Sequence, residues 1–138
     1  MTKRNSYSLY TDGASRGNPG HAGAGVVIID PKGKVICKRA VYLGKKTNNE
    51  AEYLALILGL SEVCRRCLKE ICIFLDSNLI VNQIKGVFSV KAPNLIPLYL
   101  KVRQLLRKIP KYDIFYIRRE KNKLADRLAN LGIDRELK

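Results

Sequence analysis

The spacing of apolar residues changes once along the chain, near residue 47, and this change restricts the fold to a mixed α/β architecture. Before it, Ser6–Asp12, Gly23–Ile29 and Val35–Leu43 have the alternating or compact apolar character of β-strands. Short turns join them, the first over the segment 15–20. They predict an antiparallel meander. After it, Thr47-Asn48-Asn49-Glu50 fits a capping box, and apolar residues continue at helical spacing to about Cys67.

The second half of the chain predicts alternating strands and helices. A strand over Glu70–Asp76 leads into a short helix that begins at Ser77 and ends at Gly86. A helix over Asn94–Ile109, a strand over Tyr112–Ile117 and a helix from Lys123 to about Leu131 follow. Helical crossovers produce parallel strand pairs. We therefore expect an α/β fold with a mixed five-stranded sheet in the order 3-2-1-4-5 and helices on both faces.

Composition narrows the class of protein. The 138 residues include 26 Lys and Arg but 12 Asp and Glu, a net charge of +14, which predicts a polyanionic partner. No apolar run approaches the roughly 20 residues of a membrane span, and Met1–Ser6 leads into a strand without a signal-peptide segment. We expect a soluble, cytoplasmic protein with no membrane partner, with residues 1–138 forming one domain that acts as a monomer.

The cysteines raise the question of a metal or redox site. Cys64 and Cys67 form a lone C-x-x-C pair with two arginines between them, and the single histidine, His21, is distant in sequence. Cys37 and Cys72 add no further ligand pattern. We interpret all four as small buried apolar side chains in a reducing compartment, with a structural metal or redox role as the alternative.

Four acidic residues are predicted to meet at one edge of the sheet. Asp12 and Asp76 end strands that are neighbours in the expected order, where the winding direction switches. Glu52 and Asp126 lie in the first turns of the long helix and the last helix. Turns and helix starts explain each residue singly, but not their convergence. Clustered carboxylates repel one another, and oxygen ligands without His or Cys favour Mg²⁺ or Mn²⁺ as the compensating cation.

The sequence resembles type 1 ribonuclease H, in its variety without a basic handle, over about Ser6–Gly132. The most specific match is the segment 11–20, which corresponds to the family's first motif and contains Asp12. The segments 47–52, 75–77 and 122–129 resemble the second, third and fourth motifs, with Glu52, Asp76 and Asp126 at the acidic positions.

The resemblance implies a metal-dependent endoribonuclease that cleaves the RNA strand of RNA–DNA hybrids, leaving 5′-phosphate and 3′-hydroxyl ends. The four carboxylates would be both catalytic and metal-binding, for two Mg²⁺ ions, with Mn²⁺ as an alternative. Asp12 would bridge both ions, Glu52 and Asp76 would mainly serve one, and Asp126 the other. Two ions roughly 3.5–4 Å apart can hold the attacking and leaving oxygens of an in-line displacement.

Polar residues around the first two motifs match family positions that touch the hybrid. They are Asn18, Thr47, Asn48 and Asn49. Amide and hydroxyl groups can bind a phosphate or read a 2′-hydroxyl, although turn and cap roles explain the same residues. Lys45 and Lys46 either add phosphate-binding charge or form a solvated pair. Double-stranded RNA is left open as a second partner.

Basic residues dominate the segment 77–112, which contains no Asp or Glu. The stretch 87–93 is too short for the basic handle that family members often carry. We predict instead that Arg103, Arg107 and Lys108 supply non-specific affinity along the helix itself. The alternative is a helix face that is merely solvated.

The loop 117–122 lacks the histidine that the family often has before its last aspartate. We assign its place to Arg119, with Arg118 as the alternative. A guanidinium is not a general base near neutral pH, but it can bind a phosphate through two hydrogen bonds. Two other functions remain as alternatives: a non-catalytic hybrid- or duplex-binding module, and another nuclease of this fold such as a resolvase or integrase domain.

Overall fold

The computed structural model describes residues 5–138 and contains a mixed sheet of five strands in the order β3-β2-β1-β4-β5. β1 (Tyr7–Gly17), β2 (Gly20–Ile29) and β3 (Val35–Lys46) form the antiparallel meander. β4 (Glu70–Leu75) pairs in parallel with β1, and β5 (Lys111–Tyr116) with β4. The predicted strand order and the predicted directions are therefore confirmed.

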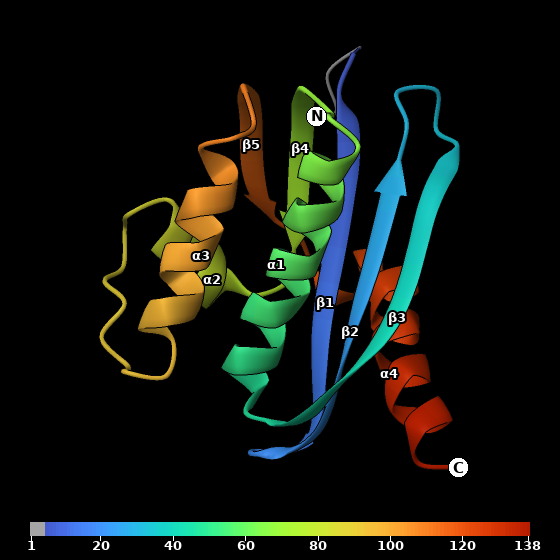
Figure 1. Ribbon diagram of the computed structural model, residues 1–138, viewed down its shortest axis with the longest axis vertical. Helices are drawn as coiled ribbons and strands as arrows, with labels where there is room; N and C mark the ends of the chain where they lie inside the picture. Colours follow the sequence, from blue (N-terminus) through green and yellow to red (C-terminus); the bar gives the residue numbers. More distant parts are fainter. Residues whose placement is uncertain (1–4) are drawn as a thin grey trace.

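Helices cover both faces of this sheet, as expected (Figure 1). α1 (Asn48–Arg65) and α3 (Ile96–Leu106) pack together on one face, and α4 (Lys123–Glu136) packs mainly on β2 and β3 from the other. α2 (Asn78–Ile84) follows β4, and a short 3-10 turn (Arg119–Lys121) precedes α4. No helix within residues 5–138 is both long and apolar enough to cross a bilayer.

Several elements differ in length from the prediction. β1 and β2 stay paired from Ser8↔Ile29 to Gly17↔Gly20, so the chain reverses only over residues 18 and 19. The turn expected over the whole segment 15–20 is therefore confined to its centre, because pairing with β2 keeps the residues before it extended. The helix predicted over Asn94–Ile109 is shorter at both ends, whereas α4 continues to Glu136.

Glycines on β2 allow α4 to lie directly against the sheet. A Cβ atom at Gly25 would lie 1.9 Å from the carbonyl oxygen of Ala125, and one at Gly23 would lie 2.1 Å from that of Ala129. Any side chain at either position would push the helix away. This contact fixes the first turn of α4, which carries Asp126.

Candidate active site

Asp12 and Asp76 are neighbours because β1 and β4 are paired in parallel. Tyr10 lies opposite Phe74 in that pairing, and two residues further along each strand come Asp12 and Asp76. Side chains repeat every second residue along a strand, so the two carboxylates project from the same face. Asp12 is 3% exposed. The predicted neighbourhood of these two residues is confirmed, and Asp76 directly follows the end of β4. The prediction that the first strand ends at Asp12 is wrong, because pairing with β2 continues β1 to Gly17.

Glu52 reaches the same point from the first turns of α1. Thr47 caps this helix: its hydroxyl accepts from the backbone N–H of Glu50, whose carboxylate accepts from the backbone N–H of Thr47. The backbone N–H of Gly13 donates to Oε1 of Glu52 at 2.7 Å. A Cβ at Gly13 would lie 2.2 Å from the carbonyl carbon of Ala51, so a glycine is required for this close approach of β1 and α1.

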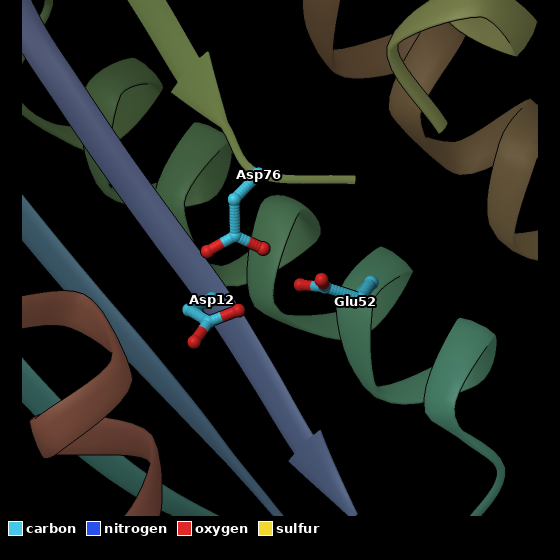
Figure 2. Close-up of side chains that lie close together, drawn as sticks. All are labelled: Asp12, Glu52 and Asp76. Carbon is cyan, nitrogen blue, oxygen red and sulfur yellow. The ribbon is translucent and has the colours of Figure 1, made fainter. Parts of the chain in front are cut away.

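Three carboxylates form one cluster. Ligand oxygens of Asp12, Glu52 and Asp76 lie within 4.8 Å of one another. Among residues 5–138, these three form the one group of three or more Asp, Glu, Cys or His side chains that could hold a metal ion. Figure 2 shows the three carboxyl groups facing one another from β1, α1 and the end of β4. None of the three forms an ion pair with a lysine or arginine within 4 Å in the described part of the chain. The donor set of hard oxygens therefore fits a divalent cation.

The charges in this cluster are strongly coupled. Burial, followed by the charges of Glu52 and Asp76, raises the pKa of Asp12 far above its ordinary value. Burial and the charge of Asp76 also raise the pKa of Glu52, although the N–H of Gly13 partly offsets this. Without a cation, the cluster therefore holds protons more tightly than isolated carboxylates do.

Asp126 joins the site from the other side of Asp12. It lies outside the cluster of three, but its carboxyl group is close enough to that of Asp12 to raise the pKa of Asp12. The amide of Asn130, one turn further along α4, donates to the carbonyl oxygen of Asp126 at 3.1 Å and to its Oδ1 at 3.4 Å. The structure thus brings all four predicted acids together, with Asp12 central.

Arg119 lines a cavity of about 340 Å³ together with the three clustered carboxylates. Its charge lowers the pKa of Glu52, the smallest of the effects on that group. Arg118 does not line this cavity. Of the two arginines predicted for the place of the missing histidine, Arg119 therefore has the position that this role needs.

The polar residues predicted to touch substrate gather around the start of α1. Asn48 and Asn49 line the acidic cavity, and Oδ1 of Asn18 accepts from the backbone N–H of Asn48 at 3.0 Å. Lys45 and Lys46 end β3 opposite His21 and Gly20, immediately before the cap. The hydroxyl of Thr47 is used in capping, so its cap role is the one that the structure shows.

The three basic residues predicted on α3 are not brought to the acidic cluster. Arg103 is half-buried, and it donates to the carbonyl oxygen of Ile84 at 2.5 Å and to the hydroxyl of Tyr99 at 3.0 Å. Lys108 lies beside Cys64 at the far end of α1, about 18 Å along the helix axis from Glu52 at 1.5 Å per residue.

Arg107 is exposed just beyond the last turn of α3. Arg103 thus ties α3 to the end of α2, a role that the spacing of charges in the sequence does not reveal.

The cysteines are free and differ in exposure. Cys37 and Cys72 are buried as predicted and Cys64 is half-buried, but the prediction is wrong for Cys67, which is exposed. Cys67 has φ 56°, a left-handed conformation just past the end of α1, which places its side chain outside the core. His21 bonds to the hydroxyl of Tyr42 at 2.7 Å and lies apart from the cysteines.

Asn122 belongs to the candidate active site, although the sequence did not predict a role for it there. It is 2% exposed, and its Nδ2 donates to the carbonyl oxygen of Thr11 at 2.9 Å and to Oδ2 of Asp76 at 3.0 Å. The residue lies within the fourth motif, but an asparagine before a helix is adequately explained as a cap. Only the three-dimensional contacts show that it joins the site.

This sheet order and acidic cluster define the class of protein as a ribonuclease H-like domain. The family model described as reverse transcriptase-like matches residues 10–132. LC11-RNase H1, isolated from compost by a metagenomic approach, has been solved in complex with an RNA/DNA hybrid. It superposes with a TM-score of 0.91 at 42% identity, covering 96% of this chain and 99% of that one.

Curated relatives point the same way. The chain is 38% identical over 127 residues to the bifunctional protein Rv2228c of Mycobacterium tuberculosis, covering 91% of this chain and 35% of that protein. It is 36% identical over 125 residues to ribonuclease HI of Halobacterium salinarum, covering 91% and 63%. The chain thus spans about a third of the first relative and less than two thirds of the second. The chain belongs to the ribonuclease H family.

Proposed function

We propose that the chain is an endoribonuclease that hydrolyses the RNA strand of RNA–DNA hybrids in a metal-dependent reaction. One observation carries the proposal: Asp12, Glu52 and Asp76 come from three different elements, lie within 4.8 Å of one another and have no basic counter-charge within ion-pair distance in the described chain. Assembling buried negative charge costs stability. A fold that keeps such a cluster gains from it only when a cation is bound.

The four carboxylates would hold two Mg²⁺ ions, with Mn²⁺ as a substitute. Asp12 is shared by two sets of acids: it clusters with Glu52 and Asp76, and Asp126 of α4 raises its pKa. This arrangement supports the division in which Asp12 serves both ions and Asp126 serves the second. Bound cations would supply charge stabilisation at the phosphate and a more acidic water.

The protein's own groups orient the carboxylates and the substrate. The N–H of Gly13 holds one oxygen of Glu52, so the other remains free as a ligand. Arg119, at the rim of the same cavity, is placed to bind a phosphate through two hydrogen bonds. Because a guanidinium stays charged near neutral pH, this group binds and orients but does not move a proton.

Recognition of the RNA strand would come from the start of α1. Asn48 and Asn49 present amides at the edge of the cavity, where they can reach a 2′-hydroxyl, the group that distinguishes RNA from DNA. Lys45 and Lys46 add charge next to these amides. The solved hybrid complex of LC11-RNase H1, at 42% identity, supports the same class of substrate.

A cleavage assay tests the proposal directly. A labelled RNA–DNA hybrid should be cut within its RNA strand in Mg²⁺, be left intact in EDTA, and yield 5′-phosphate and 3′-hydroxyl ends. Single-stranded RNA should be cut poorly, and double-stranded RNA is tested as a second substrate. Hybrid binding without cleavage in either Mg²⁺ or Mn²⁺ would instead support the non-catalytic binding module. Clustered carboxylates facing phosphates argue against that alternative, since they would weaken a pure binder.

We further propose that residues 1–138 act as a single domain, as a monomer, in the cytoplasm. Light scattering at assay concentrations tests the oligomeric state. A dimer mass there would contradict this part of the proposal without affecting the assignment of the reaction.

A further inference from the structure

Asn122 makes contacts with four of the segments that meet at the candidate active site, all except α1. Its side-chain amide donates to Oδ2 of Asp76 and to the carbonyl oxygen of Thr11, the residue before Asp12. Its backbone N–H donates to the carbonyl oxygen of Arg119 at 2.9 Å, and its own carbonyl accepts from the N–H of Asp126 at 3.1 Å. One buried residue thus connects β1, the end of β4, the turn with Arg119 and the start of α4.

The side chain does not perform the local role that its position offers. Asn122 is the N-cap residue of α4, and asparagine is among the best N-caps because its oxygen can accept from the first free N–H groups. Here no side-chain cap bond forms, and Oδ1 is buried without a partner. Helix capping therefore does not explain the residue. The side-chain amide instead donates to an oxygen within β1 and to one just after β4.

The geometry points to Asn122 as a positioning residue: we propose that its amide holds Asp76 in place against Asp12 and so sets the affinity of the acidic cluster for divalent cations. The carboxylates repel one another, so without a tether Asp76 would turn away from Asp12. The bond fixes Oδ2 of Asp76, and the carboxyl group of Asp76 faces Asp12 and Glu52 (Figure 2). Partners of this kind, one step removed from the cation, commonly change metal affinity or activity by roughly 10–100-fold when they are removed.

This inference rests on the proposed function only in assuming that the cluster binds a cation. The experiment therefore measures Mg²⁺ binding itself, by calorimetric titration of the metal-free protein without nucleic acid. We expect Asn122→Ala to weaken Mg²⁺ binding by roughly 10-fold or more. The same variant should need more Mg²⁺ for half-maximal cleavage, while its KM for hybrid at saturating Mg²⁺ stays within about twofold, because Asn122 is buried away from the substrate.

Two further variants separate positioning from stability. Asn122→Ser introduces an equally good N-cap, so α4 should start normally, but serine is too short to reach both oxygens and should weaken Mg²⁺ binding as alanine does. Gln83→Leu removes a buried hydrogen bond of 2.6 Å from the hydroxyl of Tyr53, in which none of the carboxylates takes part. It should lower the melting temperature and leave Mg²⁺ affinity unchanged.

The outcomes are distinct. Wild-type Mg²⁺ affinity in both Asn122 variants, or equal weakening in Gln83→Leu, would overturn the positioning role. If wild-type protein binds Mg²⁺ but does not cleave hybrid, the proposed function fails, whereas the comparison of affinities still decides the role of Asn122.

Discussion

Replacing Asp12 by asparagine should abolish cleavage and, in the absence of metal, make the protein more stable. The reason is the position of this carboxylate, which is 3% exposed and faces two other acids. Burial and these charges raise the pKa of Asp12 in the folded state, whereas the unfolded chain has a pKa of about 3.9. A raised folded pKa means that this group's contribution to stability is complete below about pH 4 and declines as the pH rises towards the folded pKa.

The size of the effect follows from this difference. While the folded group keeps its proton, each pH unit between the unfolded pKa and the working pH lowers the free energy of unfolding by about 1.36 kcal/mol. From about pH 3.9 to pH 7 the upper limit is about 4 kcal/mol, and relaxation of the cluster reduces it to about 1–3 kcal/mol. Since 1 kcal/mol shifts the melting temperature of a domain of this size by roughly 3–5 °C, Asp12→Asn should melt several degrees higher at pH 7 in EDTA.

Thermal unfolding at pH 4 and pH 7, with and without Mg²⁺, measures this effect. The higher melting temperature of Asp12→Asn relative to wild type should be present at pH 7 and largely absent at pH 4. Mg²⁺ should raise the melting temperature of wild type more than that of Asp12→Asn. Asp30→Asn is the matched control, because it removes one negative charge from a turn where Oδ1 accepts from the N–H groups of Lys32 and Lys34. An amide oxygen can keep those bonds. An equal or lower melting temperature for Asp12→Asn at pH 7 would refute the electrostatic reasoning.

Two further predictions concern the substrate. Arg119→Ala should lower turnover by about 10–100-fold, because it removes one charge-assisted hydrogen-bonding group that contributes roughly 1.5–3 kcal/mol. Arg118→Ala should leave turnover unchanged. The pH–rate profile of wild type should lack the inflection near pH 6.5 that a working imidazole produces. Equal turnover in the two variants would show that Arg119 has no part in the site. Lys45→Gln with Lys46→Gln should weaken hybrid binding and flatten its salt dependence by roughly 0.7–0.9 in log–log slope for each phosphate that is no longer neutralised. Lys32→Gln, in the exposed turn at the opposite end of β2 and β3 from Lys45 and Lys46, should leave that slope unchanged, and the reverse pattern would place the hybrid on another face.

The strand order could be predicted because it depends on local signals and one connection rule. The short turns of the meander and the helical crossovers on either side of β4 leave few arrangements, and the order then places Asp12 next to Asp76. The position of Glu52 could also be predicted, because the residues that follow it on the same row of the helix are apolar or small. That row therefore faces the protein interior, with the carboxylate at its end. These are consequences of periodicity, which a sequence carries directly.

Other features depend on atoms that meet across the fold. Gly23 and Gly25 read as residues of a strand, and only the approach of Ala125 to 1.9 Å of a Cβ position shows that they seat α4. Arg103 is one of several basic residues in an acid-free segment, yet it is used internally, on the carbonyl oxygen of Ile84. Sequence identifies a charge but not its partner, because side-chain direction on a helix depends on what packs beside it.

The net charge of this protein is positive, whereas the charge at the acidic cavity is negative. This contrast explains how a basic protein can still bind a cation at that cavity. A net charge of +14 attracts any polyanion, so attraction alone would hold DNA, RNA and hybrid alike. At the cavity lined by Asp12, Glu52 and Asp76 the sign is reversed, and a phosphate there is repelled until cations occupy the carboxylates. Under the proposed function, the scissile phosphate would therefore enter only when the metal needed for chemistry is bound. Under the proposed function, the amides of Asn48 and Asn49 on the same cavity would then distinguish the RNA strand at the point where it enters. Affinity from the surface and selectivity from the cavity are thus separate properties, carried by different residues.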